Sequence, residues 1–240
     1  MKHLLWNAVF VAALAPAAWS QDSTVVKDTA VVTDSAPVHI RSAFVDYSER
    51  HSLTLFGGYF GGNVGSAGVG PQSSAIVGLA YRKHLSGPVN AFARFSYAPS
   101  KRTVLDPYQP KADQVVGTTS QTLYMLDLAL TLDITGEKLW HGMSPYVGLA
   151  LGAANGGSTP DVGGYKFGTQ FYVGLGAGLK YHIKGPWVIS ASAWDYFWQL
   201  QYPTTYFVSG PNSVLPINSP DKDWTGNWAL TFGISYLLKR

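Results

Sequence analysis

The sequence predicts an all-β fold: a transmembrane antiparallel up-and-down β-barrel of eight strands, preceded by an export signal. Three observations carry this prediction. Apolar residues alternate with small or polar ones over stretches of about ten residues, which is the period of a β-strand. The connections between these stretches are alternately short and long. Aromatic residues gather at both ends of the apolar face, where the two surfaces of a bilayer would lie.

The composition narrows the class of protein. The chain has 240 residues, enough for one β-barrel domain. Charged residues make up only 13%, against a usual share of about 25%. There is no cysteine, which excludes disulfides, thiolate metal sites and a cysteine nucleophile. The net charge is +3 without a basic cluster, so we expect no nucleic-acid partner.

Residues 1–20 have the pattern of a secretory signal peptide. Lys2 and His3 give a basic start, residues 4–15 are apolar, and Ala18 and Ser20 form a small-x-small cleavage site. The apolar run is too short to span a bilayer. The pattern therefore predicts export of the chain into the cell envelope. The alternative is an N-terminal helix of a soluble protein.

Residues 21–50 are polar and predict a flexible periplasmic lead. Within them, residues 28–33 (Asp-Thr-Ala-Val-Val-Thr) resemble the short box that energised outer-membrane transporters present to a periplasmic partner. Such a box would bind by strand addition. Those transporters have a larger barrel and a plug domain, which favours the flexible lead here.

Residues 51–240 form the predicted barrel domain. The clearest strand has leucine at every second position from Leu126 to Leu132, alternating with Asp127, Ala129 and Thr131. In the seventh strand Asp195 falls on the apolar face, which a bulge or the end of the membrane zone would explain. The predicted strands are 51–60, 73–83, 89–98, 121–134, 145–154, 169–183, 187–199 and 226–238.

The connections separate a membrane barrel from a soluble sandwich, whose strands also alternate. Connections after the second, fourth and sixth strands are short. Those after the first, third, fifth and seventh are long and rich in Gly, Pro, Ser and Asn, at about 61–72, 99–120, 155–168 and 200–225. Short periplasmic turns alternating with long external loops are typical of outer-membrane barrels.

Aromatic residues on the apolar face predict two membrane belts. Amphipathic rings prefer the headgroup level, so two such belts imply a bilayer between them. Those at the long-loop ends are Tyr59, Tyr97, Tyr124, Phe171, Phe197 and Trp228, and those at the short-turn ends are Tyr81, Tyr181, Trp187 and Tyr236.

The inner face is small or polar, with a few charges. An eight-stranded barrel has room only for its own side chains, so internal charges must be paired or wet. If Tyr97 and Tyr124 are level on neighbouring strands, Arg94 and Asp127 are level too, which predicts an internal ion pair. Arg82, Asp133 and Lys180 are expected near the periplasmic end of the lumen. We interpret these charges as a plug; a polar file or gate for ions is the alternative.

Over residues 51–240 this pattern resembles the small OmpA/OmpX-type barrels of bacterial outer membranes. The last strand resembles their C-terminal assembly signal, with Gly233, Tyr236 and Leu238 at its key positions. It departs from the usual ending in closing on leucine and in the Lys239-Arg240 that follows. The resemblance implies a Gram-negative-type outer membrane, with its lipid and lipopolysaccharide and the barrel-assembly machinery as partners.

The expected function is a structural or surface-interaction role, with no catalysis, cofactor or metal. Loops on a rigid scaffold usually carry function, and the last long loop holds Tyr202, Tyr206, Phe207 and Trp224. These aromatics would either bind an extracellular ligand or pack on the barrel rim. The alternatives are a narrow pore for ions or small solutes and, less favoured, a lipid A-modifying enzyme.

Two further motifs are given structural interpretations. The sequence His84-Leu85-Ser86 superficially resembles the His-x-Ser element of lipid A deacylases, but no acid is evident near it, and we predict a turn. Asp221 and Asp223 could contact Ca²⁺, and we expect instead a solvated acidic loop tip.

Overall fold

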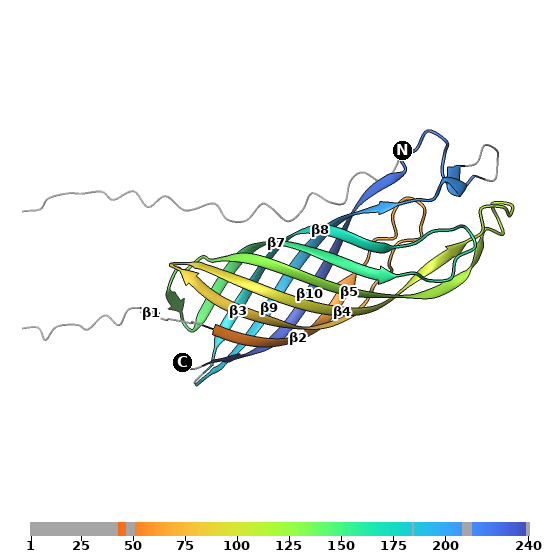
Figure 1. The fold of residues 1–240 in the computed structure, drawn as a ribbon. Helices are drawn as coiled ribbons and strands as arrows, with labels where there is room; N and C mark the ends of the chain where they lie inside the picture. Colours follow the sequence, from red (N-terminus) through yellow and green to blue (C-terminus); the bar gives the residue numbers. More distant parts are fainter. Residues whose placement is uncertain (1–42, 47–50, 184, 208–212, 239–240) are drawn as a thin grey trace, which may run out of the picture. The chain divides into compact units, whose positions relative to one another are not determined.

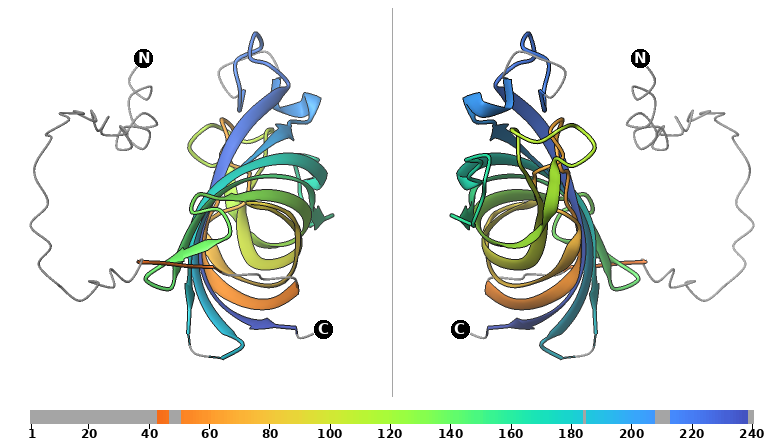
Figure 2. Two further views of the ribbon diagram at one scale, coloured as in Figure 1. Left: turned by 90° about the vertical axis from the view of Figure 1, so that its left-hand side faces the viewer. Right: turned by 90° about the vertical axis from the view of Figure 1, so that its right-hand side faces the viewer.

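A computed structural model describes residues 43–46, 51–183, 185–207 and 213–238. Eight long antiparallel strands close into a barrel (Figures 1 and 2). Its strands are β2 (His51–Gly61), β3 (Ser74–Ser86), β4 (Val89–Leu105), β5 (Val115–Asp133), β7 (Met143–Gly157), β8 (Gly168–His182), β9 (Trp187–Gln201) and β10 (Lys222–Leu237). The fold class and the strand number predicted from the sequence are confirmed.

Closure is made by the first and last long strands, since β10 pairs with β2 from Trp228 opposite Gly61 to Leu237 opposite Ser52. A path that leaves β2 at His51 and follows paired residues once around the barrel returns to β2 at Gly61, ten residues along. Eight strands with this stagger tilt by roughly 40° and leave an interior that side chains can fill.

The strands extend further at the long-connection end than predicted. β4 continues to Leu105 and β5 begins at Val115, so the connection predicted at 99–120 is reduced to 106–114. Beyond the apolar zone the backbone ladder continues, with Lys101 opposite Ser120, because backbone groups still need partners. Most of the outward side chains there are polar, including Lys101, Thr118 and Ser120, so the alternation that marks a lipid-facing strand ends before the strand does.

Two short strands lie outside the barrel wall. β1 (Phe44–Asp46) pairs with β6 (Lys138–Trp140), which lies in the connection between β5 and β7. β1 belongs to the segment predicted as a lead, and its three residues are exposed. Such a short strand has no periodic signal in the sequence. The box predicted at 28–33 and the signal peptide lie outside the described residues.

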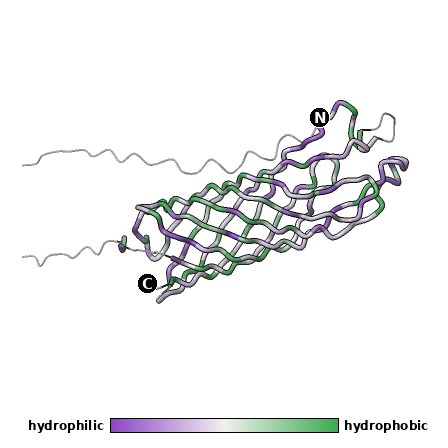
Figure 3. The backbone as a smooth tube through the Cα atoms, in the orientation of Figure 1, coloured by the Kyte–Doolittle hydropathy of each residue, from purple (hydrophilic) through white to green (hydrophobic). Residues whose placement is uncertain are grey.

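The two faces of the wall have opposite character. On β5, Leu126 and Leu128 point outward and are 61% and 68% exposed, whereas Met125 and Asp127 point inward and are almost fully buried. Figure 3 shows hydrophobic residues recurring along the barrel strands and hydrophilic residues gathered in the long connections. Large apolar side chains therefore cover the exterior, the reverse of a water-soluble sandwich.

Candidate functional site: the barrel surface, its filled lumen and its cap

The upper belt consists of the outward aromatics at the long-connection end. Tyr97 and Tyr124 are paired across β4 and β5, with ring centroids 5.5 Å apart, and Tyr59 lies 5.3 Å from Trp228 by the same measure. When the stagger between neighbouring strands is taken into account, the positions of these residues along the barrel axis differ by no more than about two residues. They are Tyr59, Tyr97, Tyr124, Phe171, Phe197 and Trp228.

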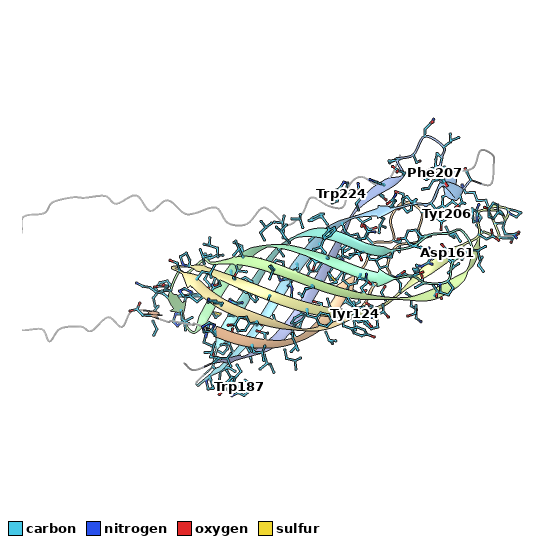
Figure 4. All side chains as sticks on the ribbon, viewed as in Figure 1. Tyr124, Asp161, Trp187, Tyr206, Phe207 and Trp224 are labelled. Atoms are coloured by element: carbon cyan, nitrogen blue, oxygen red, sulfur yellow. The ribbon has the colours of Figure 1, made fainter. Side chains whose placement is uncertain are left out.

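The lower belt consists of Tyr81, Tyr181, Trp187 and Tyr236 at the other end of the barrel. Trp187 and Tyr236 make an edge-on contact with ring centroids 5.1 Å apart, and Figure 4 places Trp187 opposite the end that carries Tyr206. Tyr81 lies nearer the middle, and its hydroxyl reaches His51 Nδ1 at 2.7 Å. Such a reach toward the polar boundary is typical of belt tyrosines.

The distance between the belts fits a bilayer. Phe171 and Tyr181 are ten residues apart on β8. At about 3.3 Å per residue and a tilt of roughly 40°, this spacing corresponds to about 25 Å along the barrel axis. That height is the usual thickness of the apolar band of outer-membrane barrels.

Asp195 lies on the outward face of β9, opposite Leu175 on β8 and Trp228 on β10. The register of β9 with both neighbours runs past Asp195 without a shift, so the bulge offered as one explanation is wrong. Asp195 is half-buried and lies just inside the upper belt. This position agrees with the other explanation, the edge of the apolar zone.

Charged side chains fill the lower lumen. Lys180 Nζ lies 2.8 Å from Asp133 Oδ2, and Asn90 donates to the same oxygen from 3.1 Å. The guanidinium of Arg82, next along the axis, lies over the ring of Phe92 at 3.9 Å and near that of Tyr146 at 5.3 Å. These contacts hold the cation on aromatic faces.

Arg94 and Asp127 meet at mid-barrel. Arg94 Nε lies 3.0 Å from Asp127 Oδ2, and the Tyr172 hydroxyl donates to the same carboxylate oxygen at 2.8 Å. The guanidinium also lies 4.4 Å from the ring of Trp194. Both charged side chains are more than 90% buried, so each depends on the other for compensation.

An apolar layer blocks the lumen above this pair. Phe60 and Trp198 stack across the interior with centroids 6.1 Å apart, and Phe167 packs edge-on against Trp198 at 5.9 Å. Ile76, Leu123 and Met125 complete the layer and are almost fully buried. No sequence pattern predicted this layer, because Phe60 and Trp198 lie at strand ends where the apolar alternation fades.

Glycines on β7 and β8 make room for the internal rings. Gly152 and Gly176 face inward, and a Cβ at either would come within 2.6 Å of Tyr172 or 2.2 Å of Trp194, respectively. The rings of the neighbouring strands therefore lie flat against a wall of bare backbone. The glycines predicted on the inner face therefore lie against large aromatic rings. The prediction of a small or polar inner face did not include these rings.

The cap consists of the connections 62–73 and 158–167 and the described part of 202–221. Arg102 of β4 is fully buried and donates to Thr159 Oγ1 at 2.8 Å and to the Pro160 carbonyl at 3.2 Å. Its Nη1 lies 3.8 Å from Asp161 Oδ1. Arg102 thereby fixes the connection 158–167 to the hairpin of β4 and β5.

Asp223 joins the first connection to the last. Its Oδ2 accepts hydrogen bonds from the backbone N and the hydroxyl of Ser66 at 2.8 and 2.6 Å and from the Tyr202 hydroxyl at 3.1 Å. The expectation of a solvated acidic loop tip is therefore wrong for Asp223, which lies at the start of β10, is half-buried and accepts hydrogen bonds from two connections. Asp221 is exposed.

The aromatic residues of the last connection divide between packing and exposure. Tyr202 and Tyr206 are buried in the cap, Phe207 is half-buried, and Trp224 is 66% exposed. Figure 4 shows where Tyr206, Phe207 and Trp224 lie at this end of the barrel. Burial raises the pKa of Tyr202 to about 12, and the nearby charge of Asp223 adds to this rise. Burial also raises the pKa values of Tyr165 and Tyr206 above their ordinary value. Most of these rings therefore pack on the rim.

The motif at His84 has an acid nearby, contrary to the expectation from the sequence. His84 Nε2 lies 3.6 Å from Glu137 Oε1, and its Nδ1 lies 3.3 Å from Asn90 Oδ1. Glu137 lies in the β5–β7 connection, just before β6. Both ring nitrogens thus face partners other than Ser86, an arrangement unlike a nucleophile–base pair.

Two features are absent from the described part of the chain. It contains no helix long and apolar enough to cross a membrane. It also contains no group of three or more His, Asp or Glu side chains placed to hold a metal ion. Gly233, Tyr236 and Leu238 lie at the end of β10 or just after it, with Gly233 inward and Tyr236 and Leu238 exposed.

No family model and no curated protein matches the sequence. Solved structures with similar folds include Neisserial surface protein A, with a TM-score of 0.47, 10% identity and coverage of 82% of this chain and 98% of that chain. The outer membrane protein OprG of Pseudomonas aeruginosa matches with a TM-score of 0.46 and 14% identity, over 79% of this chain and 97% of that chain. Ail of Yersinia pestis matches with a TM-score of 0.38 and 16% identity, over 79% of this chain and 100% of that chain. Such likenesses assign the chain to no family.

Proposed function

We propose that this chain is a non-enzymatic outer-membrane scaffold: a barrel closed to solutes that holds a rigid cap and a protruding hairpin outside a Gram-negative-type cell. The observation that carries the proposal is the apolar band between two aromatic belts around a filled lumen. In this orientation the long connections face outward and the short ones face the periplasm. Lipid and lipopolysaccharide contact the band, and the barrel-assembly machinery reads the end of β10.

The test of the membrane assignment uses two positions on the outward face of β5. Leu128 lies in the middle of the band, and Ser120 lies beyond the upper belt; both are exposed. Arginine at the bilayer midplane costs about 2–4 kcal/mol and about 0–1 kcal/mol near the interface. We therefore expect Leu128→Arg, and not Ser120→Arg, to reduce the folded, heat-modifiable form in outer-membrane fractions. Equal, small effects of the two substitutions would show that water surrounds both positions and would overturn the assignment.

The filled lumen favours the function of a scaffold and disfavours that of a pore. The layers at Lys180, Arg94 and Trp198 each consist of buried side chains in mutual contact. We expect the purified protein to give no steady conductance in planar bilayers. Stable unitary currents, absent from boiled samples, would instead support the narrow pore.

The absence of catalysis is also part of the proposal. Acyl transfer with a serine nucleophile requires a base and an acid in hydrogen-bond reach on the side where the lipid lies. The described histidines, His51, His84, His141 and His182, lie at the short-connection end or in its turns. Lipid A from cells with and without the protein should therefore have the same mass spectrum. A difference between the two spectra would favour the enzyme.

The surface-interaction part of the role is carried by the β4–β5 hairpin. It continues past the upper belt from Tyr97 and Tyr124 to its tip at 106–114 (Figure 1). Tyr108, Val115 and Val116 are 69%, 64% and 57% exposed near this tip. Apolar side chains held this far from the membrane favour contact with an apolar surface of an extracellular partner.

The hairpin is tested by adhesion. Cells that display the triple variant Tyr108→Ser, Val115→Ser and Val116→Ser should bind less to protein-coated beads than cells with the unchanged protein. The matched control is Val162→Ser with Ile217→Ser, two exposed apolar residues in other connections. Equal adhesion of the triple variant and the unchanged protein would remove the hairpin from the proposal and leave a structural role.

A further inference from the structure

A small cavity inside the barrel is lined by the side chains of both Arg82 and Arg94. Its volume is about 40 Å³. A water molecule needs about 10–15 Å³ by this measure, so the space is sufficient for a few small occupants. It is lined by Thr54, Phe56, Ala80, Arg82, Phe92, Arg94, Ala129, Tyr146, Ser190, Ser192, Trp194 and Thr231.

The lining carries positive charge without a carboxylate. Asp127 neutralises Arg94 through Nε, but it does not line the cavity. Among the described residues, no acidic side chain lies within ion-pair distance of Arg82, which is only 4% exposed. Its guanidinium lies instead over the rings of Phe92 and Tyr146. The cavity therefore has one cation in excess.

Donor groups remain available on both guanidinium groups. Arg82 Nη1 and Arg94 Nη2 are buried and have no hydrogen-bond partner within the described residues. The hydroxyls of Ser192 and Thr231, 2.8 Å apart, add a further polar wall. A buried guanidinium is costly to leave uncompensated, and the faces of aromatic rings compensate only part of the lost hydration.

We propose that this cavity binds one small monatomic anion, of the class of chloride or bromide, between Arg82 and Arg94. The cavity is too small for a carboxylate- or phosphate-bearing metabolite, and its excess cation selects an anion over water alone. The anion accepts hydrogen bonds from the two guanidinium groups and offsets the charge of Arg82. It thereby forms part of the lumen plug and is not a transported solute.

Bromide is the probe. The protein is refolded from urea into an uncharged detergent, once in sodium bromide and once in sodium gluconate at equal ionic strength. Broadening of the bromide NMR signal reports binding, and the urea midpoint of unfolding reports stabilisation. For the unchanged protein we expect broadening and a higher midpoint in bromide. No broadening and equal midpoints would show that the cavity holds water alone.

Three variants locate the binding. Arg82→Gln removes the charge, and Ala129→Leu fills the cavity while keeping Arg82; both should lose at least tenfold in bromide affinity. Lys101→Gln removes an exposed cation of β4 and should change nothing. Heat-modifiable gel mobility identifies folded samples. If Arg82→Gln does not fold, the bromide affinity of Ala129→Leu tests the site. Undiminished bromide binding in a folded cavity variant would overturn the proposal.

Discussion

Gly176 on β8 lies directly opposite Trp194 on β9, and a Cβ at Gly176 would come within 2.2 Å of the indole ring. The ring can therefore lie flat on the barrel wall, from where it contacts the guanidinium of Arg94. The absence of one side chain thus fixes the position of a large one and, through it, of a buried charge.

We expect Gly176→Val to destabilise the barrel by about 1–3 kcal/mol, because overpacking forces the indole out of place. Urea unfolding followed by gel mobility measures the change. The control is Gly57→Ala on β2, where a Cβ would meet only ordinary contacts at 3.7 Å. A Gly176→Val protein as stable as the control would show that Trp194 repacks without cost.

The pair of Arg94 and Asp127 should show strong coupling. Asp127→Leu leaves Arg94 charged and buried and deprives the Tyr172 hydroxyl of its acceptor, and we expect a loss of about 3–5 kcal/mol. The double variant Arg94→Met with Asp127→Leu should recover most of that loss, since no lone charge remains. A double-mutant cycle from urea unfolding provides the coupling energy. Additive losses would contradict the interpretation of a mutually dependent pair.

Asp223 should hold the connection 62–73 in place. We expect Asp223→Ala to increase cleavage within 62–73 by a protease of broad specificity, because three hydrogen bonds from Ser66 and Tyr202 are lost. The neighbouring exposed Asp221→Ala is the control. The barrel itself should keep its heat-modifiable mobility in both variants. Equal cleavage rates would show that the cap is held by its apolar packing alone.

The cap tyrosines predict loss of stability at high pH. The pKa of Tyr202 is raised to about 12, from about 10 in an unfolded chain. This contribution to stability is complete below pH 10 and is lost as the pH rises through the folded-state value, since only the unfolded form ionises in between. Absorbance titration should show delayed ionisation in the unchanged protein, with one delayed group fewer in Tyr202→Phe. An unchanged number of delayed groups in Tyr202→Phe would contradict the assignment.

The sequence predicted the wall of the barrel better than its contents. Alternation of leucines on β5 and the belt aromatics follow from one local rule, the period of a strand in contact with lipid. The facing positions of Arg94 and Asp127 could be anticipated because two aromatic residues set the register of neighbouring strands. Such inferences need only one pair of strands at a time.

The contents of the lumen and cap depend on strands that are distant in the sequence. Phe60 and Trp198 come from opposite ends of the chain, and Arg102 contacts a connection more than fifty residues away. No local pattern indicates these contacts. The proximity of Glu137 to His84 was missed for the same reason, since it depends on how a turn folds back against another hairpin.

The seam between β2 and β10 has a consequence for biogenesis. Because the first wall strand finds its partner only in the last, every partial chain emerging from the ribosome presents two unsatisfied edges that invite aggregation. Closure therefore requires the last strand, and no shorter chain can satisfy the edge of β2 in this way. A premature stop anywhere before residue 222 would abolish the whole cylinder and not merely shorten it.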